Sequence, residues 1–167
     1  MEKWKLYCDG STKTNPGIGA WAAILIDEQV PEPAHELITT KAYERTTNNR
    51  MEMLGVIEPL ERLHELSVWG ISGKVLVHVF SDSKYVVKGI TDYMPSWKKR
   101  QWRTSKGSPV KNQDLWVRLN EMMGSMEIVF TWVKGHSDNA LNNRCDVLAR
   151  DALNNNIKYP DNGYTTT

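Results

Sequence analysis

The sequence lacks several features that define large classes of proteins. Its 167 residues include only two cysteines, Cys8 and Cys145, which excludes a disulfide scaffold and a zinc site of closely spaced cysteines. No run of about 18 apolar residues occurs, so no membrane-spanning helix is expected. Residues 1–5 lack the apolar stretch of a secretory signal, and we therefore expect a cytoplasmic protein.

The composition is that of an ordinary soluble globular domain, with 40% hydrophobic and 25% charged residues. No internal repeat and no interdomain linker is apparent. We expect one domain over residues 1–154, followed by a polar and mobile tail over residues 155–167. A monomer with no membrane partner is the expected state.

Positive charge is concentrated in one segment, although the net charge of the chain is only +1. Residues 97–118 contain seven basic residues and one acid, Asp114, so this segment carries +6 and the rest of the chain −5. A basic segment on an acidic body suggests one place that contacts phosphates and another place with a different role.

Hydrophobic patterns predict alternating groups of strands and helices. Apolar and β-branched runs predict strands, and these are at 5–9, 20–26, 36–45, 75–80 and 128–133. Helical spacing follows possible N-caps at residues 46–49 and near residues 138–142, and two more helices are expected at 83–90 and 113–123. The order β-β-β-α-β-α-α-β-α predicts an α/β fold, a five-stranded mixed sheet with helices on both faces.

Two of these elements carry more specific expectations. Residues 75–80 are apolar apart from His78, which predicts a central parallel strand buried on both faces. The first long helix contains Pro59, which removes a backbone donor and should kink or end the helix there. Residues 64–74 then form an unusually long connection to the next strand.

Four acidic residues stand out by their positions. Asp9 and Asp82 end predicted strands, Glu52 falls in the first turn of a helix, and Asp146 falls early in the last helix. Each is ordinary by itself, since an acid near a helix N-terminus is favoured by the helix dipole. If the first and fourth strands are neighbours, the four carboxylates converge and repel each other, and divalent cations would remove that repulsion.

The residues around these acids resemble the type 1 ribonuclease H family in its bacterial form. Four stretches in order, each holding one acid, carry the resemblance along residues 4–153. They are Tyr7–Ser11 with Asn15–Gly17, Thr46–Glu52, Ser81–Val86, and Trp132–His136 with Cys145 and Asp146 downstream.

The resemblance implies a metal-dependent endonuclease that hydrolyses the RNA strand of an RNA/DNA hybrid and leaves 5′-phosphate and 3′-hydroxyl ends. It implies that Asp9, Glu52, Asp82 and Asp146 are catalytic acids that bind two Mg²⁺ ions, with Mn²⁺ as a possible substitute. His136 matches the family's loop histidine, which assists proton movement or product release. A histidine beside glycine is otherwise an ordinary solvated loop residue.

Contacts with the hybrid are also implied by the resemblance. Arg45 and Thr47 match a pocket that holds a phosphate of the DNA strand. Asn48, Asn49 and Asn15 match positions that contact the minor groove.

The basic segment resembles the protrusion of bacterial members of the family. Its implied nucleic-acid contacts are Trp97, Lys98, Lys99, Arg100 and Trp102. Lysine and arginine suit contacts with phosphates. The tryptophans equally suit packing of the protrusion onto the body, and the cations could simply be a solvated face.

Two other functions are compatible with such a fold. A non-catalytic hybrid-binding module would be expected to lose an acid, and all four are present. A resolvase-like or transposase-like nuclease would usually lack the Thr46–Glu52 motif and the protrusion. Asp138 and Asn143 depart from the family pattern near the loop and the last motif, but neither replaces one of the four acids.

Overall fold

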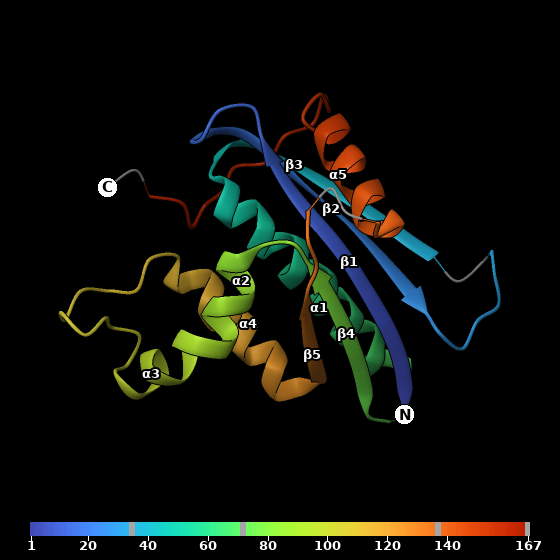
Figure 1. The fold of residues 1–167 in the computed structure, drawn as a ribbon, viewed down its shortest axis with the longest axis horizontal. Helices are drawn as coiled ribbons and strands as arrows, with labels where there is room; N and C mark the ends of the chain where they lie inside the picture. Colours follow the sequence, from blue (N-terminus) through green and yellow to red (C-terminus); the bar gives the residue numbers. More distant parts are fainter. Residues whose placement is uncertain (34–35, 71–72, 136–137, 166–167) are drawn as a thin grey trace.

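The computed structural model describes residues 1–33, 36–70, 73–135 and 138–165, and its centre is one five-stranded sheet (Figure 1). The strands are β1 (Glu2–Thr12), β2 (Gly17–Asp27), β3 (Glu36–Thr46), β4 (Val75–Ser81) and β5 (Glu127–Trp132), in the spatial order β3-β2-β1-β4-β5. The pairs β1–β2 and β2–β3 are antiparallel, whereas β1–β4 and β4–β5 are parallel. The predicted mixed sheet is confirmed.

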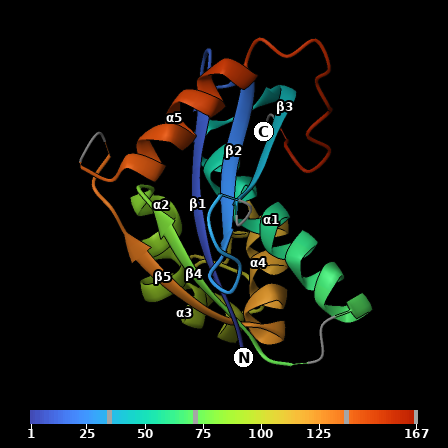
Figure 2. The ribbon, with the colours of Figure 1, turned by 90° about the vertical axis from the view of Figure 1, so that its right-hand side faces the viewer.

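Helices cover both faces of this sheet. They are α1 (Asn48–Gly70), α2 (Lys84–Lys88), the π-helical turn η1 (Gly89–Tyr93), α3 (Met94–Lys99), α4 (Gln113–Ser125) and α5 (Ala140–Ala152). Figure 2 shows α5 on one face of the sheet and α1 on the other. Among the described residues, no helix is both long enough and apolar enough to cross a membrane.

Alternation along β1 explains why helices pack on both faces. Leu6 and Cys8 point into the larger core with α1, whereas Tyr7 points to the opposite face and packs near Ile24 and Cys145. The two cysteines are free and buried in different cores. They are packing residues, as the sequence predicts.

The α1 helix corrects one expectation from the sequence. It does not end at Pro59 but continues to Gly70. Proline removes one backbone donor, and buried residues on both sides of it hold the helix against the sheet. These residues are Met51, Leu54, Ile57, Leu60 and Leu63. Much of the long segment 64–74 therefore extends α1.

The β4 strand is central and parallel as predicted, but it is fully buried on only one face. Val75, Val77 and Val79 are buried, whereas His78 and Phe80 are half-buried. The rings of His78 and Phe80 stack with centroids 4.1 Å apart. Helix α5 packs on β1, β2 and β3, so this side of β4 is less covered.

The described part of the polar tail, residues 155–165, lies against the domain. Tyr159 forms two backbone hydrogen bonds to β3, donating to the Ala42 carbonyl at 2.9 Å and accepting from the Glu44 amide at 2.9 Å. The Asp161 carboxylate accepts hydrogen bonds from Thr46 and Arg50. The tail that the sequence suggests is mobile is thus tied to the domain at two points.

Candidate active site

The parallel pairing of β1 and β4 brings two of the predicted acids together. Tyr7 pairs with Phe80, so two residues further along each strand Asp9 and Asp82 reach the same level. Asp82 follows β4 directly, as predicted. Asp9 does not end its strand, because β1 continues to Thr12 in its pairing with β2. It lies where the pairing with β4 stops, which leaves its side chain room for a neighbour.

Helix α1 supplies the third acid, Glu52. The Thr47 hydroxyl accepts a hydrogen bond from the Arg50 amide at 3.3 Å and caps the helix. Glu52 is the fifth residue of α1, so it begins the second turn rather than lying in the first. A β-carbon on Gly10 would lie 2.7 Å from the Glu52 amide nitrogen. Glycine at this position lets α1 approach β1 closely enough to place Glu52 beside Asp9.

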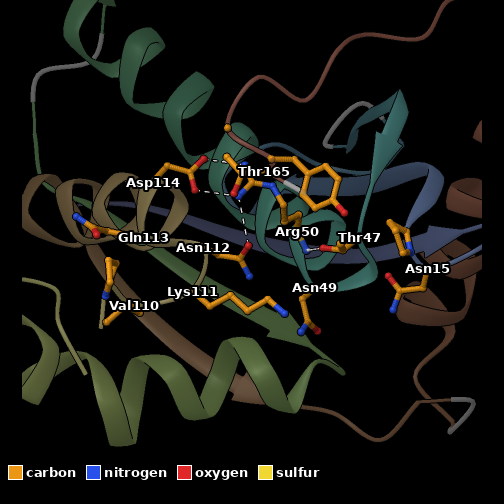
Figure 3. A pocket seen from close by; sticks show the side chains of 14 residues that line it. Asn15, Thr47, Asn49, Arg50, Val110, Lys111, Asn112, Gln113, Asp114 and Thr165 are labelled. Atoms are coloured by element: carbon orange, nitrogen blue, oxygen red, sulfur yellow. Dashed lines mark hydrogen bonds and ion pairs between the residues drawn. The ribbon is translucent and has the colours of Figure 1, made fainter. Parts of the chain in front are cut away.

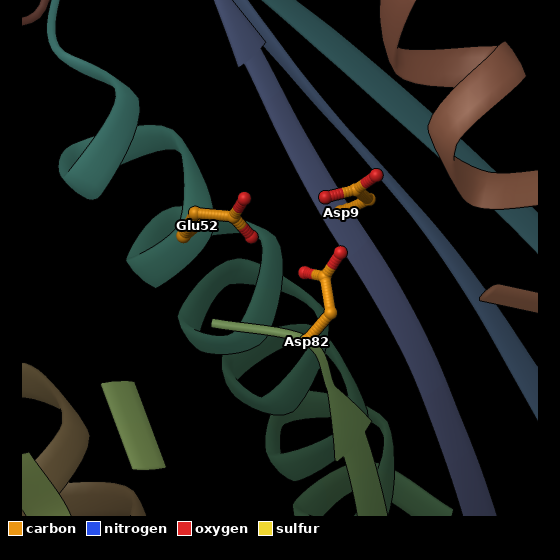
Figure 4. Close-up of side chains that lie close together, drawn as sticks. All are labelled: Asp9, Glu52 and Asp82. Atoms are coloured by element: carbon orange, nitrogen blue, oxygen red, sulfur yellow. The ribbon is translucent and has the colours of Figure 1, made fainter. Parts of the chain in front are cut away.

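Asp9, Glu52 and Asp82 converge into what we call the acidic cluster (Figure 4). One carboxylate oxygen from each lies within 4.8 Å of the other two. Asp9 is 6% exposed and Glu52 8% exposed. Burial, together with the charge of Asp82, raises the pKa of Asp9 to about 7. Burial and the charges of Asp9 and Asp82 raise the pKa of Glu52 well above its ordinary value.

Asp146, the fourth predicted acid, lies beside the acidic cluster rather than within it. It is in the middle of α5, not early in the helix. A hydrogen bond between Asp146 and Asp9 contributes to the raised pKa of Asp9. The Arg150 guanidinium, one helical turn later, lies 3.2 Å from the Asp146 carboxylate. The structure therefore brings three of the four acids together and places the fourth next to Asp9.

The acidic cluster has the donor set that divalent cations prefer. Glu52 Oε2 is buried and has no hydrogen-bond partner among the residues that the structure describes, which is costly for a polar oxygen. Neither Asp9 nor Glu52 forms an ion pair with a described basic residue. Carboxylate oxygens are the ligands of Mg²⁺, Ca²⁺ and Mn²⁺. These residues fit a divalent metal site.

The segment after β5 runs past Asp82. Trp132 donates its indole N–H to the Asp82 carbonyl at 3.0 Å, and the Val133 amide donates to the Ser81 carbonyl at 2.9 Å. A β-carbon on Gly135 would lie 3.0 Å from Asp82 Oδ2. The predicted loop histidine, His136, follows directly but lies outside the described residues.

Three of the predicted nucleic-acid contacts line a groove of about 930 Å³ at the start of α1 (Figure 3). These are Asn15, Thr47 and Asn49. Asn15 also accepts a hydrogen bond from the Asn48 amide at 3.0 Å, which joins the β1–β2 turn to α1. Asn48 and Arg45 are exposed and do not line the groove.

The protrusion presents its cations to solvent and packs its tryptophans. Lys98, Lys99 and Arg100 are exposed at the end of α3, whereas Trp97 and Trp102 are half-buried. The Trp97 ring lies against Tyr93 and Trp116, with centroids 5.7 and 5.3 Å away. The packing role that the sequence suggests for Trp97 is therefore observed, and its contact with nucleic acid stays a prediction.

Sequence reasoning missed a second group of charges, which we call the arginine cluster: Arg50, Asp114 and Asp161. Arg50 is 2% exposed and lies between the two carboxylates. It donates to Asp114 at 2.8 and 2.7 Å and to Asp161 at 2.8 and 3.0 Å. Arg50 belongs to the quoted helix motif, but nothing in the sequence pairs it with acids 64 and 111 residues away.

Comparison with known proteins adds to this geometry. A family model described as RNase H matches residues 1–154. The chain belongs to the ribonuclease H family. It is 42% identical to a ribonuclease H of Pseudoalteromonas atlantica over 98% of this chain and 99% of that protein. It is also 42% identical to ribonuclease HI of Haemophilus influenzae, over 90% of each chain.

Solved ribonuclease H structures share the fold. LC9-RNase H1, a type 1 RNase H with the type 2 active-site motif, superposes with a TM-score of 0.75 at 25% identity, over 92% of this chain and 72% of that one. LC11-RNase H1, solved with an RNA/DNA hybrid, superposes with a TM-score of 0.63 at 20% identity, over 90% of this chain and 96% of that one. The predicted ribonuclease H fold is thus confirmed.

Proposed function

We propose that this chain hydrolyses the RNA strand of RNA/DNA hybrids at the acidic cluster, by two-metal-ion catalysis. The observation that carries the proposal is the convergence of Asp9, Glu52 and Asp82, with one buried Glu52 oxygen that has no partner in the described part of the chain. The ribonuclease H names of its relatives support the same reaction and substrate.

The residues of this chain would bind the metal ions and fix their positions. Asp9, Glu52 and Asp82 would bind divalent ions, Mg²⁺ with Mn²⁺ as a substitute, and Asp146 would complete the site from α5. Such ions supply an activated water and stabilise the leaving oxygen of the phosphodiester. Gly10 and the Thr47 cap fix Glu52 against β1, so the carboxylates are in place before substrate binds. Hydrolysis would leave 5′-phosphate and 3′-hydroxyl ends.

Substrate contacts extend from the groove to the protrusion in this proposal. Asn15, Thr47 and Asn49 line the groove, and the exposed Lys98, Lys99 and Arg100 offer phosphate contacts. A role for Arg45, Asn48, Trp97 and Trp102 in binding, and one for His136 in proton movement, are proposed from the family resemblance. A monomeric state and a cytoplasmic location stay predictions.

Cleavage of an end-labelled RNA strand tests this proposal. The labelled RNA is presented with Mg²⁺ paired with DNA, single-stranded, or paired with RNA. A labelled DNA duplex of the same sequence is the fourth substrate. We expect the hybrid alone to be cut, and Asp9→Asn to abolish the cut. Hybrid that is bound but left intact by the wild type in both Mg²⁺ and Mn²⁺ would instead indicate a non-catalytic binding module.

A further inference from the structure

The groove at the start of α1 has a wall that comes from the C-terminal segment. Its lining combines residues of the β1–β2 turn, the first turn of α1, residues 109–114 and residues 163–165 (Figure 3). The last of these segments follows α5, more than a hundred residues after the start of α1. Something must therefore hold the chain end at this position.

Asp161 is the anchor of this segment. Its side chain is only 5% exposed, and it accepts from Arg50 Nε at 2.8 Å, Arg50 Nη2 at 3.0 Å and Thr46 Oγ1 at 2.7 Å. The Tyr164 amide then donates to the Asp161 carbonyl at 3.1 Å, which closes a turn. A β-carbon on Gly163 would overlap the Asp114 carboxylate and the Arg50 guanidinium. Glycine thus lets the backbone cross directly over the ion pair.

Arg50 is fully occupied by these contacts. Its Nε donates once, and Nη1 and Nη2 donate twice each, to Asp114, Asp161 and Asn112. Five N–H groups are all that a guanidinium has. Although Arg50 lines the groove, it has no donor left for a phosphate, and with two carboxylates the arginine cluster carries a net charge of −1.

The groups that remain for a ligand are mostly neutral. Tyr164 and Thr165 from the chain end face the groove together with Thr47, Asn15 and Asn49, and Lys111 adds one cation. Hydroxyls and amides suit the sugars and phosphates of a nucleic-acid strand, which a protein positions with many such contacts. A groove of this composition suits a polymer backbone better than a small free anion.

We propose that residues 161–165 form a wall of the substrate groove, and that Tyr164 contacts the backbone of the bound nucleic-acid strand. The proposal rests on the function proposed above and adds the chain end to the binding surface. Asp161 acts as a positioning residue, since it holds the segment of Tyr164 through Arg50 and does not line the groove. Gly163 lets the backbone beside Tyr164 pass over the ion pair.

Hybrid affinity of Tyr164→Ala, measured without metal so that no cleavage occurs, tests this proposal. Tyr159→Ala is the matched control, because Tyr159 lies on the same segment, is 48% exposed and does not line the groove. We expect Tyr164→Ala to raise the Kd for the hybrid about fivefold or more. With Mg²⁺ it should raise KM while kcat at saturating hybrid stays within twofold, and the thermal midpoint should not move. Tyr159→Ala should leave Kd and KM unchanged.

The failures of the two proposals are distinguishable. If wild type binds and cuts the hybrid and Tyr164→Ala binds it within twofold of wild type, the wall proposal is wrong and the proposed function stands. If wild type neither binds nor cuts the hybrid, the proposed function itself is wrong.

A chain ending at Asn162 keeps Asp161 and should also bind the hybrid more weakly than wild type. Tighter binding by this shortened chain would overturn the proposal, since the segment would then cover the groove instead of lining it.

Discussion

Two groups of carboxylates lie at the start of α1, and they differ in whether the protein places a cation beside them. In the arginine cluster, burial works against ionisation, but the hydrogen bonds and charge of Arg50 lower the pKa of Asp114. In the acidic cluster, burial and like charge raise the pKa of Asp9 and Glu52. Arg50 and Glu52 are only two residues apart on one helix. In the first group both carboxylates pair with an arginine of the protein, whereas Asp9 and Glu52 in the second group pair with no described basic residue and fit cations from solution.

This difference predicts opposite effects of removing an acid on the free energy of unfolding. The loss of an acid should not lower it at the acidic cluster and should lower it at the arginine cluster. Buried like charges destabilise the fold that holds them, so an acidic-cluster variant should lose activity without losing stability. A carboxylate that pairs with Arg50 contributes to stability instead. The predictions below test this contrast, from the largest expected effect to the smallest.

Asp82→Asn should reduce Mg²⁺-dependent cleavage of the hybrid by about a thousandfold or more, because a metal ion contributes several kcal/mol to stabilising the transition state. In metal-free buffer its free energy of unfolding should equal or exceed that of wild type, since the charge of Asp82 disfavours the ionised forms of Asp9 and Glu52. Initial cleavage rates and urea unfolding measure the two effects. An active variant, or one inactive because it is less stable, would contradict the assignment.

Arg50→Met should lower the free energy of unfolding by about 3–5 kcal/mol, because Asp161 would be left buried without its cation. Urea unfolding at pH 7 measures this loss. The double variant Arg50→Met with Asp161→Leu is the control. It should recover much of the stability, since the uncompensated buried charge is gone. No recovery would show that Arg50 matters through its packing and not through its charge.

The two acids of the arginine cluster should differ in their contributions. Asp161 is 5% exposed and Asp114 41% exposed, so solvent screens the second pair far more. Asp161→Asn should cost about 2 kcal/mol and Asp114→Asn about 1 kcal/mol or less. Urea midpoints of the two variants, compared at equal slopes, measure the difference. A larger loss of stability in Asp114→Asn than in Asp161→Asn would show that solvent exposure does not determine how much each contact contributes.

Metal-free protein should become less stable as the pH rises from about 4 to about 7, between the ordinary and the folded pKa of Asp9. The pKa of Asp9 in the folded protein is about 7, above its ordinary value of 3.8. The folded state therefore holds a proton that the unfolded state has already lost, and stability falls as pH rises through the folded pKa. The slope can reach about 1.4 kcal/mol per pH unit for each proton. Urea unfolding with a chelator measures it, and Asp9→Asn should flatten the slope.

Much of the sheet and part of the site could be predicted from the sequence, because they depend on local patterns. Apolar and β-branched runs located the strands, and the motifs around Asp9, Glu52 and Asp82 located the acids. The extent of α1 could not be predicted, since Pro59 has a local cost and the packing that overrides it is tertiary. The arginine cluster could not be predicted either, because Asp114 and Asp161 reach Arg50 only after the chain has folded.

The Mg²⁺ dependence of the free energy of unfolding tests the central claim most directly, which is that Asp9, Glu52 and Asp82 bind divalent cations. Wild type at pH 7.5 should gain about 2.7 kcal/mol at a Mg²⁺ concentration one hundred times its Kd. Asp9→Asn should gain much less, and Asp114→Asn should gain as much as wild type. A wild-type protein whose stability does not respond to Mg²⁺ or Mn²⁺, or an equal gain in Asp9→Asn, would contradict the claim.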